Sequence, residues 1–382
     1  MKKESVQINL LHILNDGFKA SLLLFLPFIA KEFMISLTKV GILGSAINSL
    51  EIILALPASH LASKIGGKKI LVASLFFVAV GYFITGISPH YSFVVFAFII
   101  AGIGFGMFHP VAFALVSRMF GKGKRGKQIG NFTALGDLGR VGLSSIITIV
   151  IVYIGWRSTT VAISLILLFL GLYFIHLIRK DIPIETKVER EEGISYKDAL
   201  KNKKFIFATA SFCLDTIASG SLFVFIPFLL LQRNVSYAFL GVLTSTFFIG
   251  NMFGKVLLGR LVDRFGNTKV FIISELFMAL FIVILSNATW LPLIIGASII
   301  LGVFTKGTIP VLTEMVVESV EHKSGTEKAF GLNATFVGIA STIGPFILGF
   351  LSDRFGIVMA FNFSAVLAIF ATVPAFLFSK MK

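Results

Sequence analysis

Charged side chains occur inside long apolar segments of this sequence. They are Asp16, Lys19, Glu51, Asp137, Arg140, Asp215, Lys255, Glu275 and Lys306. If these segments cross a lipid bilayer, an ionised side chain facing lipid at mid-membrane costs about 2.5–3.5 kcal/mol on insertion scales. These groups are therefore expected to face a water-filled cavity, to pair with one another, or to be neutral. Groups of this kind can bind protons or the charged parts of a substrate.

Two local spacings bring some of these side chains together. His12, Asp16 and Lys19 follow an i, i+4, i+7 spacing on one face of a helix, and Asp137 and Arg140, three residues apart, can pair. An acid beside a histidine and a lysine can change protonation as its surroundings alternate between dry and wet. We therefore expect Asp16 to couple transport to protons. The rival proton-coupling candidates are Glu51 and Asp215.

Several polar residues are expected to line a substrate cavity. They lie about eight to twelve residues inside their segments, which at about 1.5 Å per residue is near mid-membrane. The candidates are His12, Asn15, Lys19, His109, Asp137, Arg140 and Lys306. Each has a structural alternative: Asp137–Arg140 as a static ion pair, for example, or His109 as the cap of a kink at Pro110. Lys255 can instead extend to the membrane surface, and Glu275 lies in a helix expected at the periphery.

The composition places the chain in a membrane. Of its 382 residues, 56% are hydrophobic and 14% are charged, and the mean hydropathy is +0.93. A soluble protein of this length needs far more polar surface, and the apolar runs of roughly 20 residues are each long enough to cross a bilayer as a helix. The sequence therefore predicts an all-α integral membrane protein with twelve spans. They are placed at about 8–30, 39–60, 69–87, 91–119, 128–154, 158–179, 204–231, 237–260, 268–287, 291–318, 327–351 and 357–379.

The basic residues predict the orientation of these spans. An even number of spans puts both termini on one side, and most basic clusters fall there, including the GKGKRGK loop at 121–127. Loops rich in Lys and Arg stay in the cytoplasm. We therefore expect both termini in the cytoplasm and a multi-pass protein of the cytoplasmic (inner) membrane. The net charge of +15 is explained in the same way, without a nucleic-acid partner.

The two halves of the sequence repeat each other. SLLLFLPF at 21–28 and SLFVFIPF at 221–228 are displaced by 221 − 21 = 200 residues, and Gly66 and Gly266 share that displacement. Six spans in each half give parallel repeats, related by an axis along the membrane normal. The predicted domains are an N-terminal six-helix bundle at 1–179, a charged cytoplasmic linker at 180–203 and a C-terminal six-helix bundle at 204–382. Lys306 stands where the first half has Gly106, which suggests a site for a negative ligand group.

These features resemble the major facilitator superfamily over the whole chain. GRLVDRFGNTK at 259–269 is similar to the family's cytoplasmic motif, whereas its first-half equivalent, SHLASKIGGKK at 59–69, is degraded. The resemblance implies the twelve-helix major facilitator fold and a gating role for Asp263 and Arg264 at the cytoplasmic rim. HILNDGF at 12–18 and FHP at 108–110 further resemble the fosmidomycin-resistance type of drug efflux protein. Phe98 and the absence of a Gly-Pro pair in span five depart from the common drug:proton antiporter pattern.

The expected function is secondary transport by alternating access, most simply the export of an organic solute or drug in exchange for protons. The alternatives are a proton-coupled uptake symporter for an organic anion and a non-transporting membrane sensor or lipid scramblase on the same fold. The chain has no phosphate-binding G-x-x-x-x-G-K-[ST] loop, and its histidines and single cysteine show no metal-ligand spacing. We therefore expect no enzyme activity, no cofactor and no metal. The expected partners are a small organic solute, in one interpretation an anion, together with protons and the bilayer, and the chain is expected to work as a monomer.

Overall fold

The computed structural model describes residues 3–119, 122–177, 196–320 and 326–381, and every regular element in these ranges is a helix. The first half contains α1 (Lys3–Leu24), α2 (Leu26–Phe33), α3 (Leu37–Ile53), α4 (Ala55–Ile65), α5 (Gly67–Ile87), α6 (Tyr91–Met119), α7 (Lys122–Ile154) and α8 (Trp156–Leu177). The second half contains α9 (Tyr196–Lys201), α10 (Lys203–Gly220), α11 (Leu222–Gln232), the 3-10 helix η1 (Tyr237–Phe239), α12 (Leu240–Phe265), α13 (Asn267–Asn287), α14 (Leu291–Lys306), α15 (Thr308–Val320), α16 (Thr326–Phe355) and α17 (Ile357–Ser379).

The prediction of an all-α membrane fold is confirmed. Within the described residues, 11 helical segments are long and apolar enough to cross a membrane, and the bent pair α3–α4, with an angle of 49°, brings the number to 12. Besides α3–α4, three spans consist of two successive α-helices: α1–α2, α10–α11 and α14–α15. The repeat is imperfect at one point that matters below. The fourth span is the continuous helix α6, whereas its second-half equivalent breaks after Lys306.

The chain forms two compact units. Unit 1 comprises Met1–Ile35, Ile42–Val188 and Val235–Ser245, and unit 2 comprises Ser36–Gly41, Glu189–Asn234 and Thr246–Lys382. Most of the predicted linker at 180–203 lies outside the described residues, and the end that is described contains α9. The predicted domain boundaries therefore stay a prediction.

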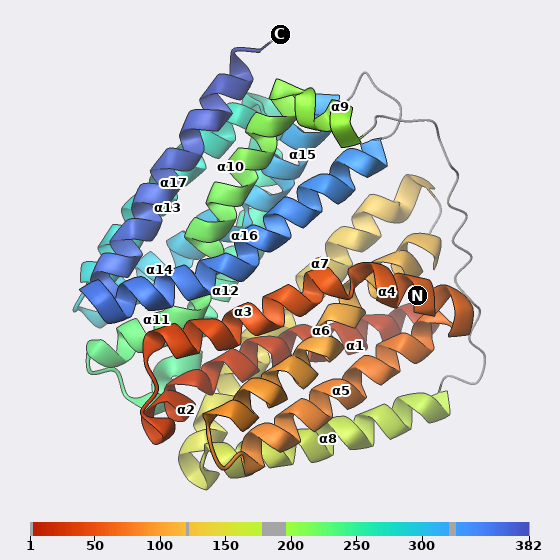
Figure 1. The fold of residues 1–382 in the computed structure, drawn as a ribbon, viewed down its shortest axis with the longest axis vertical. Coiled ribbons are helices and arrows are strands. Elements are labelled where there is room, and N and C mark those ends of the chain that lie inside the picture. Colours follow the sequence, from red (N-terminus) through yellow and green to blue (C-terminus); the bar gives the residue numbers. More distant parts are fainter. Residues whose placement is uncertain (1–2, 120–121, 178–195, 321–325, 382) are drawn as a thin grey trace. The chain divides into compact units, whose positions relative to one another are not determined.

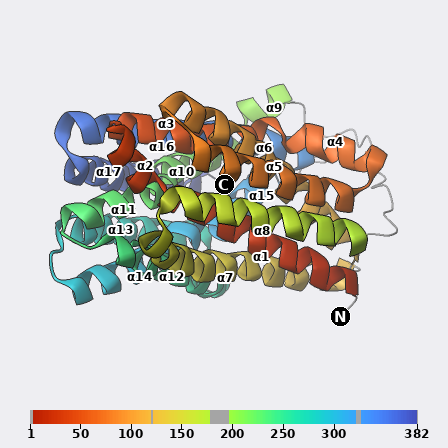
Figure 2. The ribbon, with the colours of Figure 1, turned by 90° about the horizontal axis from the view of Figure 1, so that it is seen from below.

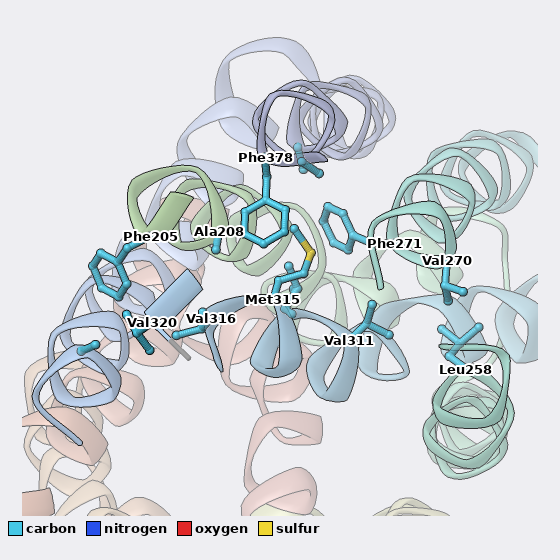
Figure 3. Packing of buried hydrophobic residues seen from close by; sticks show 14 of the residues in the cluster. Phe205, Ala208, Leu258, Val270, Phe271, Val311, Met315, Val316, Val320 and Phe378 are labelled. Atoms are coloured by element: carbon cyan, nitrogen blue, oxygen red, sulfur yellow. The ribbon is translucent and has the colours of Figure 1, made fainter. Parts of the chain in front are cut away.

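Within unit 1, α5 packs along both α6 and α8, and α7 runs along α1 (Figures 1 and 2). Within unit 2, α17 packs along α10 and α13, and α10 also contacts α16 (Figure 1). A buried apolar cluster joins α10, α13 and α15 of this unit, and Figure 3 shows Met315 of α15 pointing toward Phe271 and Phe378.

Tight turns between consecutive helices account for two of the repeated glycines. Gly66 joins α4 to α5 with φ 108°, and Gly266 joins α12 to α13 with φ 83°. Residues with a side chain rarely adopt such positive φ angles, so each position favours glycine. The degraded motif of the first half therefore keeps the residue that the turn requires.

Residues 36–41 belong to unit 2 because a carboxylate of α16 binds them. Asp353 accepts hydrogen bonds from the backbone N–H groups of Leu37 and Thr38 at 2.8 and 2.7 Å. It also accepts one from the Thr38 hydroxyl at 2.5 Å. The first N–H groups of a helix have no partner within the helix, so an acidic side chain at this end of α3 is stabilising.

A second polar network holds α2, α5 and α8 of unit 1 together. Arg157 donates to Oε1 of Glu32 at 2.9 and 2.7 Å and to the Gly86 carbonyl at 2.9 Å. Trp156 donates its indole N–H to the other Glu32 oxygen at 2.6 Å, and the Arg157 guanidinium lies 4.6 Å from the Trp156 ring. Trp156 and Arg157 thus have a structural role, and Glu32 is their acidic partner.

We expect Arg157→Ala to lower the thermal stability of the detergent-solubilised protein. The change removes several charge-assisted hydrogen bonds at once, and for groups this exposed the loss is about 1–3 kcal/mol. Arg157→Lys should recover only part of the loss, because an ammonium group cannot reproduce the fork geometry. The measurement is the melting temperature, with Arg354→Ala as a control at an exposed arginine. Equal melting temperatures for Arg157→Ala and this control would contradict the expectation.

Candidate functional site

Asp16 is the centre of a buried polar cluster in unit 1. Its side chain, on α1, is 2% exposed, and its two oxygens have different partners. Oδ2 lies 2.7 Å from Nη2 of Arg140 and 3.3 Å from Nε2 of His12. Oδ1 lies 3.1 Å from Nε2 of His109 and accepts from the Asn15 amide at 3.2 Å. Four of the predicted site residues therefore converge on the one predicted to carry a proton.

The orientation of His12 implies a proton between it and Asp16. Nδ1 of His12 lies 2.8 Å from the carbonyl oxygen of Phe132 on α7, and this contact requires Nδ1 to carry a hydrogen. Nε2 of a neutral ring would then present a lone pair to the carboxylate, which is repulsive. The approach of Nε2 to Asp16 is favourable when either His12 or Asp16 holds one more proton. One proton on either His12 or Asp16 therefore makes both contacts of the His12 ring favourable.

Arg140 joins the two aspartates of the cluster. Its Nη1 lies 2.9 Å from Oδ1 of Asp137, which is fully buried, while Nη2 contacts Asp16. The local Asp137–Arg140 pair is therefore present, as the spacing predicts. Arg140 keeps 23% of its side chain exposed. It can exchange part of its contact with Asp16 for a contact with a substrate.

Lys19 and Glu51 form a separate ion pair one turn farther along α1. Lys19 Nζ contacts Oε1 of Glu51 on α3, and the two side chains are 20% and 30% exposed. Lys19 therefore shares a helix face with His12 and Asp16, as predicted, but its ionic partner is on another helix. Both acids have a cationic partner, but Glu51 is more exposed than Asp16 and has no histidine contact like those of Asp16 among the ion pairs of the described residues.

Glycines on α7 let this helix approach α1 closely enough to build the cluster. A Cβ atom at Gly136 would lie 2.6 Å from both Oδ2 of Asp16 and Cε1 of His12. A Cβ atom at Gly139 would overlap the carbonyl oxygen of Ile13 on α1. Both positions therefore require glycine, because no side chain fits against the neighbouring helix. The close approach is what brings Arg140 to Asp16.

Aromatic rings cover the histidines. The His12 ring stacks on Phe132 with centroids 3.8 Å apart and lies 5.8 Å from Phe108. The His109 ring stacks on Phe113 at 6.0 Å. Phe132 could not be predicted as a site residue from the sequence, because its polar contribution is a backbone carbonyl, which every residue has. These rings limit the water around Asp16 and strengthen its electrostatic contacts.

His12, Asp16 and His109 are also spaced to hold a metal ion, because their ligand atoms all lie within 4.8 Å of one another. The sequence predicted no metal site. Arg140 already occupies Oδ2 of Asp16, and its positive charge opposes a divalent cation at this point. The donor set therefore fits a proton better than a metal ion.

In unit 2, Asp215 occupies the position on α10 that nearly corresponds to Asp16. It is 2% exposed and accepts a hydrogen bond from the Thr308 hydroxyl at 3.1 Å. Lys306, at the end of α14, acts on it electrostatically. The break between α14 and α15 thus places both Lys306 and Thr308 near Asp215. The histidines of the first half have no equivalents at this site.

The predicted gate residues lie at the end of α12. Asp263 and Arg264 are both exposed, and the Arg264 guanidinium lies 5.2 Å from the Phe265 ring. Their gating role stays a prediction.

Comparison with known proteins agrees with the fold and with the motifs. The sequence pattern described as Major Facilitator Superfamily matches residues 8–236 and again residues 208–381. The chain belongs to the major facilitator superfamily. Members of this superfamily are transporters rather than enzymes, so the prediction of a non-enzyme is confirmed. The double match also fits the repeat of the two halves.

Individual superfamily members are only distantly similar. A putative metabolite transport protein of Haemophilus influenzae is 24% identical over 329 residues, covering 82% of this chain and 78% of its own length. Multidrug resistance protein 2 of Bacillus subtilis is 27% identical over 171 residues, covering 45% of this chain and 42% of its own. A bacterial homologue of the human lysosomal transporter Spinster, solved in an inward-facing, unoccupied conformation, has a TM-score of 0.79 and 14% identity. That structural match covers 100% of this chain and 98% of the homologue, and it shows the shared fold.

Proposed function

We propose that this transporter exports an organic solute or drug in exchange for protons, by alternating access, with Asp16 as the proton-coupling residue. The observation that carries the proposal is the contact of Asp16 with His12, His109 and Arg140. The attraction between Asp16 and these three side chains depends on how many protons Asp16 and the two histidines hold. The similarity to a multidrug resistance protein supports a drug or another organic solute as the substrate.

The cluster suggests how a proton and a substrate exclude each other. With Asp16 ionised, Arg140 is held by two carboxylates, and the cluster attracts a proton or a cationic substrate group. When a proton binds to Asp16, the attraction to Arg140 weakens, and the site loses affinity for a cation. Binding of either one therefore disfavours the other, which is the requirement for exchange.

We further propose that the protein resembles the fosmidomycin-resistance type within the superfamily. Support comes from the polar residues of HILNDGF and FHP, since His12, Asp16 and His109 lie in direct contact. In line with the distribution of basic residues, both termini face the cytoplasm, the protein resides in the cytoplasmic membrane, and it works as a monomer. The other proton-coupling and cavity candidates, including Asp215 and Lys306, keep those proposed roles.

One observation favours a second candidate function, the proton-coupled uptake of an organic anion. The Arg140 side chain is 23% exposed, and a guanidinium that exchanges its aspartate contacts for a substrate can bind a carboxylate or phosphonate in two hydrogen bonds. The similarity to a putative metabolite transport protein fits a metabolite as the substrate.

The direction of coupling separates the two functions. The purified protein is reconstituted in liposomes at zero membrane potential, and accumulation of amphipathic cations, neutral drugs and phosphonate-like anions is measured with either side made acidic. We expect accumulation only when the lumen is acidic, because a substrate then enters as protons leave. Accumulation only when the outside is acidic would support uptake instead and contradict export.

A further inference from the structure

Glu275 is a carboxyl group that the Asp16 cluster does not explain. It lies on α13 in unit 2, is fully buried, and neither of its oxygens has a hydrogen-bond partner among the described residues. An ionised carboxylate in such a place costs several kcal/mol, because nothing replaces its hydration. A protonated carboxyl group avoids most of this cost.

A second acid stands beside it. The Asp215 carboxyl is close enough to interact with Glu275 electrostatically, and it is also buried. The surroundings of Asp215 stabilise its negative charge, because it accepts a hydrogen bond from Thr308 and interacts electrostatically with Lys306. The described surroundings of Glu275 offer neither. Two neighbouring carboxyls in a dry site cannot both be ionised without strong repulsion. The arrangement of lowest energy therefore has a protonated Glu275, which has no hydrogen-bond partner in the described part of the chain, and an ionised Asp215, which accepts a hydrogen bond from Thr308.

The surrounding helices offer little else that is charged. Helix α17, which packs on both α10 and α13, carries no ionisable side chain, and neither does α16 between residues 329 and 352. Glu314 and Glu318 of α15 are exposed. Among the described residues, Lys306 acts electrostatically on Asp215, and no cation is found to act on Glu275.

The buried apolar cluster of unit 2 packs beside one end of the Asp215–Glu275 pair. Ala208 lies two helical turns before Asp215 on α10, and Phe271 lies one turn before Glu275 on α13. Val311 follows Thr308 by about one turn on α15, and Figure 3 shows these three helices meeting around Met315. Water is therefore excluded from this side of the two carboxyls.

We propose that Asp215 and Glu275 together form a second proton-binding site, in which Glu275 carries one exchangeable proton at neutral pH while Asp215 stays ionised. The ligand of this site is a proton. The proposal does not depend on the exchange of protons for a substrate at Asp16, because it concerns a different unit of the chain and needs no transport activity.

Infrared difference spectroscopy of the full-length protein in lipid tests the proposal. The spectrum of Glu275→Gln is subtracted from that of the wild type at neutral pH, in H2O and in D2O. We expect a carbonyl-stretching band of a protonated carboxyl group in the wild type, which moves in D2O and is lost in Glu275→Gln. Glu314→Gln, which removes an exposed acid from the same unit, should leave this band unchanged.

Three results would overturn the proposal. The first is a wild-type spectrum whose protonated-carboxyl region is the same in Glu275→Gln, because Glu275 would then be ionised. The second is a band that never moves in D2O, because its proton would not exchange. The third is a Glu275→Gln variant that fails to fold, because glutamine has the shape and neutrality of the protonated acid and should be tolerated.

Discussion

Asp16→Asn is expected to abolish proton-driven accumulation of substrate. Because asparagine is neutral like protonated Asp16, the variant should bind a cationic substrate more weakly but still bind it when the substrate is saturating. With one proton exchanged per substrate and no membrane potential, a gradient of one pH unit supports about a tenfold accumulation, because one pH unit corresponds to about 1.4 kcal/mol. Asparagine cannot bind or release the proton, so the variant should show no accumulation. The measurement is substrate uptake into proteoliposomes with an acidic lumen.

Substrate counterflow distinguishes loss of coupling from loss of folding. Asp16→Asn should still exchange labelled for unlabelled substrate at equal pH, because that exchange needs no net proton movement. Glu51→Gln is the comparison variant, since it neutralises the rival acid, which is paired with Lys19. Full accumulation by Asp16→Asn, with loss in Glu51→Gln, would move the coupling role to Glu51.

Gly139→Ala is expected to destabilise the protein strongly. The added methyl group would overlap the backbone of Ile13, so α1 and α7 must separate. Overpacking of this kind costs about 1–3 kcal/mol, and more where the obstructing atom is backbone. The same separation moves Arg140 away from Asp16 and should weaken coupling as well. Melting temperature and monodispersity in detergent measure the first effect.

Gly142→Ala is the matched control for this prediction. Gly142 lies on the same helix, but nothing occupies the space around its Cβ position. Alanine should therefore be tolerated there, or stabilise α7 by up to about 1 kcal/mol through its better helix propensity. If the two variants were equally stable, the close packing of α1 on α7 at Gly139 would be wrong.

The fold could be predicted from the sequence because its main signals are long and repeated. Apolar runs define the spans, and the displacement of 200 residues between Gly66 and Gly266 defines the halves. The spans and the repeat remain recognisable in the sequence even where a helix is interrupted, as it is after Lys306. Gly307 and Pro310 stand at that break, but α6 continues through the equivalent Pro110, so these residues alone do not decide where a helix is interrupted.

The site could be predicted only in part. The contacts of His12 with Asp16 and of Arg140 with Asp137 follow from helical spacing. The contact of Arg140 with Asp16 joins residues 124 positions apart and depends on the glycines that bring α7 to α1. Glu32 and Glu275 illustrate the same limit. Their partners lie on other helices, and no spacing within their own helix indicates them.

The most direct test of the account is substrate-elicited proton flux in proteoliposomes that enclose a pH-sensitive dye. Substrate is added outside without an imposed pH gradient. Proton-coupled export predicts that the lumen of wild-type liposomes becomes more alkaline as protons leave, and that Asp16→Asn gives no signal. Substrate entry without proton movement, or with acidification of the lumen, would contradict proton-coupled export.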